Sequence, residues 1–149
     1  MYKIGIITVS DKGARGERVD ESGPAIREMV QSLGEVTSCV VVPDDLDLLK
    51  EAMINMSDKE KVDLIFTSGG TGFSSRDNTP EATLAVIHKQ APGLAEAMRA
   101  ESLKKTNRAM LTRAVAGIRN STLIINMPGS VKAVKECLAV IMPALPHGL

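Results

Sequence analysis

Four short, almost continuously apolar segments recur along the chain, and longer segments with apolar residues at helical spacing separate them. We predict strands at Lys3–Val9, Val36–Val42, Val62–Phe66 and Thr122–Asn126. We predict helices from about Pro24 to Leu33 and at Leu46–Met56, Pro80–Gln90, Leu94–Lys104 and Val131–Ala144. Residues 108–117 are ambiguous, since their start favours helix and their end favours loop. Apolar strands that alternate with helices are typical of an α/β protein whose mainly parallel sheet has helices on both faces.

The composition favours one soluble, cytoplasmic domain over residues 1–149 that binds neither nucleic acid nor membranes. The chain has 18 basic and 18 acidic residues, so it lacks the surplus positive charge that polyanionic partners attract. It has only one Tyr, two Phe and no Trp, too few for a platform that stacks bases. No apolar run approaches the roughly 20 residues that span a bilayer. The isolated Cys39 and Cys137 are expected to be buried thiols in a reducing compartment.

Four loops follow the predicted strands and define where a ligand should bind. In mainly parallel sheets, ligands bind just beyond the carboxyl ends of the strands. The loops in question are Ser10–Glu21, Pro43–Asp45, Ser68–Thr79 and Met127–Ser130.

The loop after the third predicted strand carries the most information, and its surroundings read TSGGTGFSSRDNTPEAT from Thr67 to Thr83. Glycines let the backbone approach a ligand closely, and exposed N–H groups in such a loop form an anion-binding hollow. Thr79 is a good helix N-cap and Pro80 suits the first helical position, so a positive helix end should lie beside the loop. A tight turn without a ligand is the alternative for the glycines alone. The convergence of glycines, hydroxyls and a cation favours phosphate binding by Gly69, Gly70, Thr71, Gly72, Ser74, Ser75 and Arg76.

Two carboxylates at the same edge of the predicted sheet point to a divalent cation. Asp77 stands within the phosphate-binding loop, where it would repel an anionic ligand unless a metal ion lay between them. Mg²⁺ is the usual mediator, because it takes one or two carboxylates and completes its shell with phosphates and water. Asp44, after the second strand, could supply the second carboxylate. Asp44 could equally be the N-cap of the next helix, a role that Asp45 would fill as well.

The remaining loops are polar and belong to the same edge. Ser130 is a plausible N-cap of the last helix, and Lys132 in its first turn could meet an anion or simply be solvated. We include in the candidate substrate site Ser10, Asp11, Asn126, Pro128, Gly129 and Ser130.

Together these motifs resemble the molybdopterin adenylyltransferase family over nearly the whole chain. The resemblance rests on TSGGTGFSSRDNTPEAT, on ITVSDKGARG and DESG after the first strand, on VVPDD after the second, and on INMPGSVKA near the end. It implies a three-layer α/β/α sandwich, with a mainly parallel sheet and an antiparallel edge strand, that usually assembles as a homotrimer.

The resemblance also implies a reaction and the residues that serve it. The family converts ATP and molybdopterin, with Mg²⁺, into adenylylated molybdopterin and pyrophosphate, after which a partner enzyme inserts molybdate. The two carboxylates that the family needs as catalytic and metal-binding groups correspond to Asp44 and Asp77. The substrate-phosphate region corresponds to Gly69 to Ser75, with Asn126 and Pro128 to Ser130 beside it. A non-catalytic molybdopterin-binding module, or an enzyme acting on another phosphorylated metabolite, are the alternatives.

Overall fold

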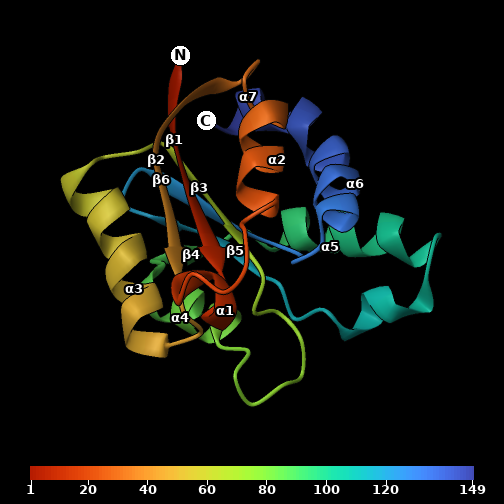
Figure 1. Ribbon diagram of the computed structural model, residues 1–149. Coiled ribbons are helices and arrows are strands. Elements are labelled where there is room, and N and C mark those ends of the chain that lie inside the picture. Colours follow the sequence, from red (N-terminus) through yellow and green to blue (C-terminus); the bar gives the residue numbers. More distant parts are fainter.

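The computed structural model describes all residues, 1–149, and contains one six-stranded sheet with helices on both sides (Figure 1). The strands are β1 (Tyr2–Val9), β2 (Gly34–Val42), β3 (Leu64–Ser68), β4 (Lys89–Gln90), β5 (Ala116–Arg119) and β6 (Thr122–Met127). Their order across the sheet is β2-β1-β3-β6-β5-β4. Strands β1, β2, β3 and β6 are parallel, whereas β5 is antiparallel to both of its neighbours. The predicted three-layer, mainly parallel fold is confirmed, and the expected antiparallel strand is β5, beside the short outermost β4.

The helices flank the sheet, and short helical turns extend two of them. The α-helices are α1 (Asp11–Ala14), α2 (Ser22–Met29), α3 (Leu46–Ile54), α4 (Thr79–Val86), α5 (Pro92–Leu103), α6 (Val131–Ile141) and α7 (Leu145–Gly148). The π-helical turn η1 (Asn55–Lys59) continues α3, and the 3₁₀ turns are η2 (Asn107–Leu111) and η3 (Met142–Ala144). None of these helices has the length and apolarity that crossing a membrane requires.

Alternating side chains of the strands build two separate cores, one on each face of the sheet. On the face that α2, α5 and α6 cover, Ile6 and Phe66 pack against Leu138. On the face that α3 and α4 cover, Ile7 and Ile65 pack with residues of those two helices. Figure 1 shows α3 and α4 on one side of the strands and α2 and α6 on the other. Both faces of the central strands are therefore buried, which explains their continuous apolar sequences.

The part of the sheet that the sequence analysis missed lies at the β4–β5 edge. The helix predicted over Pro80–Gln90 ends at Val86, because Ile87 is extended and His88 donates its N–H to the Ile118 carbonyl at 2.7 Å. Residues Lys89–Gln90 then pair with β5, a strand that begins at the end of the ambiguous segment 108–117, where loop was favoured. Pairing between distant segments overrides local helix propensity here.

Other element ends differ from the predictions by a few residues. The helix predicted from about Pro24 to Leu33 begins at Ser22 and ends at Met29, and Gly34 opens β2. A side chain at Gly34 would collide with the Tyr2 carbonyl, which explains a glycine in this strand. The two cysteines also differ from expectation: Cys137 is buried, whereas Cys39 is exposed on the outermost strand β2.

Asn126, which was predicted to contact substrate, is fully buried and cross-links the sheet. Its Nδ2 atom donates to Thr67 Oγ1 at 3.0 Å and to Thr83 Oγ1 at 2.9 Å. Its Oδ1 atom accepts from the Val115 N–H at 3.1 Å. These bonds use the side-chain amide to join β3, β6, α4 and the segment before β5. The structure therefore gives Asn126 a role within the fold.

We predict that Asn126→Ala destabilises the protein by about 2 kcal/mol, since buried partners lose their hydrogen bonds. Urea unfolding measures this change. The exposed Asn107 has no side-chain hydrogen bond, so Asn107→Ala is the control and should stay within about 0.5 kcal/mol of wild type. Equal effects of the two substitutions would contradict the cross-linking role.

Candidate functional site

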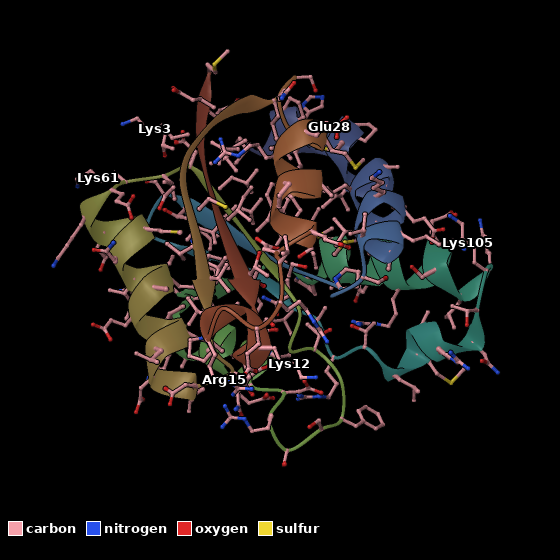
Figure 2. The ribbon with its side chains drawn as sticks, viewed as in Figure 1. Lys3, Lys12, Arg15, Glu28, Lys61 and Lys105 are labelled. Atoms are coloured by element: carbon pink, nitrogen blue, oxygen red, sulfur yellow. The ribbon has the colours of Figure 1, made fainter.

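The predicted site residues gather at one end of the sheet, beyond the carboxyl ends of β1, β2, β3 and β6. The parallel register puts Thr8 beside Ser68 and Ser68 beside Met127, so the loops that follow these strands begin side by side. Figure 1 shows α1 and the loop between β3 and α4 at this end of the molecule. The labelled side chains of Lys12 and Arg15 lie there too, whereas Lys3 and Lys61 lie at the opposite end (Figure 2).

Glycine geometry fixes the start of the loop between β3 and α4, which we call the glycine loop (residues 69–78). Gly69 has φ +101°, and a side chain there would come within 2.7 Å of the Val9 carbonyl oxygen. Its N–H donates to the Met127 carbonyl at 3.1 Å, and Ser68 Oγ donates to the Pro128 carbonyl at 2.8 Å. These contacts join the loops after β1, β3 and β6. Only glycine suits both the left-handed backbone and the close approach.

Asp44 directs its carboxylate at the second glycine of this loop. A side chain at Gly70, where φ is +70°, would come within 2.7 Å of Asp44 Oδ1. Asp44 Oδ1 and Thr79 Oγ1 are the only buried side-chain oxygens without a hydrogen-bond partner, and both lie against Gly70. A buried carboxylate oxygen without a partner is unfavourable, so this position is suited to a cation or a donor that the protein itself does not provide.

The ends of the helices explain why the Asp44 side chain does not cap a helix. Asp45 caps α3, since its side chain accepts the Leu48 N–H at 3.0 Å. Of the two alternatives for a helix cap, the structure thus selects Asp45. Thr79 was predicted to cap α4, and that prediction is wrong: Thr79 is the first helical residue, and Asn78 precedes it without a side-chain cap. Ser130 caps α6 as predicted, by accepting the Ala133 N–H at 3.2 Å.

Asp77 faces the glycine loop from its far end. Its Oδ2 atom accepts the Ser74 N–H at 2.9 Å, and its own N–H donates to the Ser74 carbonyl at 2.9 Å. A side chain at Gly72 would come within 2.9 Å of Asp77 Oδ2. The Oδ1 atom accepts no hydrogen bond from the protein. The backbone N–H groups of residues 70–72 are also not used within the protein, which leaves donors for an anion next to a carboxylate oxygen.

Arg76, predicted as a cation for phosphate, is bound to Asp11 in this structure. Its Nε and Nη2 atoms donate to the two Asp11 oxygens at 3.1 and 2.8 Å. Asp11 Oδ1 also accepts the Asp44 N–H at 2.9 Å. The hydrogen bonds from Arg76 and from the Asp44 backbone hold the pKa of Asp11 below its ordinary value. A ligand phosphate would have to compete with Asp11 for this guanidinium group.

The electrostatics single out Asp44 among these acidic groups. Burial raises its pKa from 3.8 to about 6, and the charges of Asp11 and Asp77 act in the same direction. The two predicted catalytic carboxylates lie against the same loop, Asp44 at Gly70 and Asp77 at Gly72. No group of three or more His, Cys, Asp or Glu side chains is placed to hold a metal. Two carboxylates with free oxygens suit Mg²⁺, which takes the rest of its shell from phosphates and water.

A cavity of about 710 Å³ opens between the loops after β1 and β6. Ser10, Gly129 and Ser130 line it, whereas Asp44, Asp77 and residues 69–76 do not. Its size falls in the range of small-molecule sites. Asp20 also lines it, held by Thr8 Oγ1 and the Gly23 N–H at 3.0 Å each. In the sequence, Asp20 belongs to the polar loop Ser10–Glu21 near the site, and the DESG motif after a strand is the signal that could identify it as a site residue.

Comparison with known proteins gives consistent matches. A family model described as a probable molybdopterin binding domain matches residues 5–147. The molybdopterin adenylyltransferase of Helicobacter pylori strain J99 is 44% identical over 97% of this chain and 84% of its own. Among solved structures, the molybdopterin biosynthesis enzyme MoaB from Thermus thermophilus is 49% identical, with a TM-score of 0.93, over 99% of this chain and 94% of its own.

A second solved structure, described as the tungsten cofactor synthesizing protein MoaB from Pyrococcus furiosus, is 40% identical with a TM-score of 0.88. The match covers 99% of this chain and 94% of that one. The similarity therefore includes every loop that builds the candidate site.

The raised pKa of Asp44 predicts how the metal-free protein responds to pH. The folded protein holds this proton more tightly than the unfolded chain, so stability falls as pH rises from 3.8 towards about 6 and stays lower above that. Asp44→Asn removes the effect. We expect the variant to exceed wild type by about 1 kcal/mol near neutral pH, discounted for partial solvent exposure, or roughly 3 °C in Tm. The gain should vanish as pH falls below about 4.

Thermal unfolding in EDTA across this pH range measures the difference. Asp47→Asn is the matched control, because Asp47 is an exposed acidic residue in the first turn of α3. A gain for Asp44→Asn that did not depend on pH, or that Asp47→Asn reproduced, would contradict the unfavourable burial of Asp44.

Proposed function

Because the chain belongs to the molybdopterin-binding domain family, we propose that it transfers the adenylyl group of Mg-ATP to the terminal phosphate of molybdopterin and releases pyrophosphate. The chain is an enzyme of molybdenum-cofactor synthesis, similar over most of its length to several molybdopterin adenylyltransferases. The main support for adenylyl transfer is that Asp44 and Asp77 both lie against the glycine loop. The Oδ1 atom of Asp44 is buried there and has no hydrogen-bond partner.

The donors around the glycine loop support phosphate binding. Unused backbone N–H groups of Gly70, Thr71 and Gly72 can donate to phosphate oxygens, and the N-terminus of α4 adds a positive dipole end. Two acidic side chains amid such donors would repel ATP unless a cation lay between. Asp44 and Asp77 would hold Mg²⁺, which when bound supplies positive charge to the phosphates at the reacting centre.

The proposed reaction needs no activated side chain. A terminal phosphate oxygen of molybdopterin, already an anion, forms a bond to the α-phosphorus of ATP. The bond from the α-phosphorus to the bridging oxygen breaks, and its electron pair leaves with pyrophosphate. The protein then contributes alignment and neutralisation of charge, through the loop N–H groups and through the Mg²⁺ that the two carboxylates would hold. The chain accordingly shows no Ser-His or Cys-His pair at this edge.

Further proposals follow from the same family membership. We propose a homotrimer located in the cytoplasm that passes adenylylated molybdopterin to a molybdate-inserting enzyme. The apolar side chains of Met110 and Leu111 are exposed and could be covered in such an assembly. We propose no nucleic-acid partner, because basic and acidic residues balance.

The pure protein with ATP, Mg²⁺ and molybdopterin should release pyrophosphate, and omission of molybdopterin or addition of excess EDTA should abolish the release. A coupled phosphate assay with inorganic pyrophosphatase measures it. Tight molybdopterin binding without pyrophosphate release would instead favour a non-catalytic binding module. Absence of molybdopterin binding would favour another phosphorylated metabolite as substrate.

Asp77→Asn should lower turnover by about 100-fold or more while the Kd for molybdopterin stays within about threefold of wild type, because a carboxylate lost from the metal site removes charge neutralisation only in the reaction. Steady-state kinetics and equilibrium dialysis separate the two effects. Asp47→Asn serves again as the control for removal of one acidic group. Equal losses in turnover and in molybdopterin binding would count against a metal-binding role for Asp77.

A further inference from the structure

Arg113 contacts both ends of the exposed part of the glycine loop from a distant segment of the chain. It lies in the connection between η2 and β5, and its N–H donates to the Thr71 carbonyl at 2.8 Å. Its Nε atom donates to the Gly72 carbonyl at 2.7 Å, and its Nη2 atom donates to the Asp77 carbonyl at 2.9 Å. The third nitrogen, Nη1, donates to Glu81 Oε2 at 2.6 Å, which fixes the guanidinium group from the side of α4.

These contacts matter because the hydrogen bonds inside the loop, between Ser74 and Asp77, do not attach it to the rest of the protein. Residues 73–76 are exposed, and Phe73 is 71% exposed, so no side chain of this stretch packs into either core. The loop is bounded by the buried residues Thr71 and Thr79. The Thr79 N–H closes the base of the loop by donating to the Gly70 carbonyl at 3.2 Å, and the guanidinium of Arg113 joins Gly72 to Asp77, on either side of the exposed residues. Its side chain is one-third exposed, so these hydrogen bonds are partly shielded from water.

The only other side chain that ties this stretch to a neighbouring loop is Arg76, through Asp11. That ion pair is more exposed, with 59% of the Arg76 side chain accessible, and exposed ion pairs contribute little. The Arg76 guanidinium also stands where a ligand phosphate could attract it. Arg113 instead donates to two backbone carbonyls of the glycine loop and to Glu81 of α4.

We propose that Arg113 is a positioning residue, which holds the backbone of Asp77 so that its carboxylate faces Asp44 across the glycine loop. This inference rests on the adenylyl transfer proposed above. Arginine is required because its planar fork donates simultaneously to Gly72, Asp77 and Glu81. A lysine ammonium is a single point charge and can reach only some of these acceptors.

The test compares Arg113→Lys with Arg99→Lys. Arg99 is a matched control, because its Nη1 and Nη2 atoms donate to the Thr112 and Ala114 carbonyls, on either side of Arg113, without touching the glycine loop. Both variants keep a positive charge and lose arginine–carbonyl hydrogen bonds in the same segment. Only Arg113→Lys removes hydrogen bonds to the glycine loop.

For Arg113→Lys we expect a kcat lower by about tenfold and a higher Mg²⁺ concentration for half activation, with the Kd for molybdopterin within about twofold of wild type. Combined with Asp77→Asn, the substitution should cause almost no further loss, because the carboxylate that it positions is already gone. Arg99→Lys should leave the Mg²⁺ requirement unchanged. Equal Mg²⁺ requirements for the two lysine variants, or additive losses in the double variant, would overturn the positioning role.

Hydrogen exchange of backbone amides tests the role of Arg113 without any substrate. In Arg113→Lys, amides of a peptide covering residues 70–78 should exchange about tenfold faster, while peptides from β3 and β6 stay protected. Unchanged exchange in this peptide would also overturn the inference. If wild type released no pyrophosphate, the proposed function would fail, and exchange would still decide whether Arg113 holds the loop.

Discussion

Burial of the Asp44 carboxylate beside two other acidic side chains is the unfavourable interaction around which this end of the sheet is arranged. Its pKa rises to about 6 because of burial and the nearby charges of Asp11 and Asp77. The protein relieves part of the repulsion by binding Arg76 to Asp11, which neutralises one of the three groups. It leaves the Asp44 and Asp77 pair without a cation of its own. Two carboxylates without an ion-pair partner lower the stability of the fold. Their presence is explained if a bound ligand or cation compensates their charge, so the arrangement favours function over stability.

The pair can meet only because the strands that carry it are parallel and in register. Asp44 follows β2 and Asp77 lies in the loop after β3, with β1 between the two strands in the sheet. The absence of side chains at Gly69 and Gly70 lets the loop turn back against Val9 and Asp44. Any side chain at Gly70 would occupy the space beside the unpartnered Asp44 oxygen. The same backbone geometry therefore creates the turn and the opening for a ligand.

The features that the sequence could predict are those set by local pattern. Apolar runs predicted the central strands, and the position of each loop after a strand predicted the edge at which Asp44 and Asp77 come together. Contacts between segments that are distant in the sequence could not be predicted from local pattern. Strand β5 forms because it pairs with β6, although the sequence AGIR has weak strand character of its own. The partner of Arg76 and the burial of Asn126 likewise depend on which loops the fold brings together.

Arg113 shows why a residue that positions the site could not be predicted from the local sequence pattern. It lies in a segment without clear secondary structure, 36 residues from Asp77 and 41 from Gly72. Burying the middle of the glycine loop would close the proposed site. Arg113 instead holds the residues on either side of the exposed stretch 73–76, so the proposed positioning of the Asp77 carboxylate does not require that stretch to be buried. Arg113 binds backbone carbonyls of the loop. The arrangement therefore fixes the path of the loop backbone but places little restriction on which side chains the exposed positions carry.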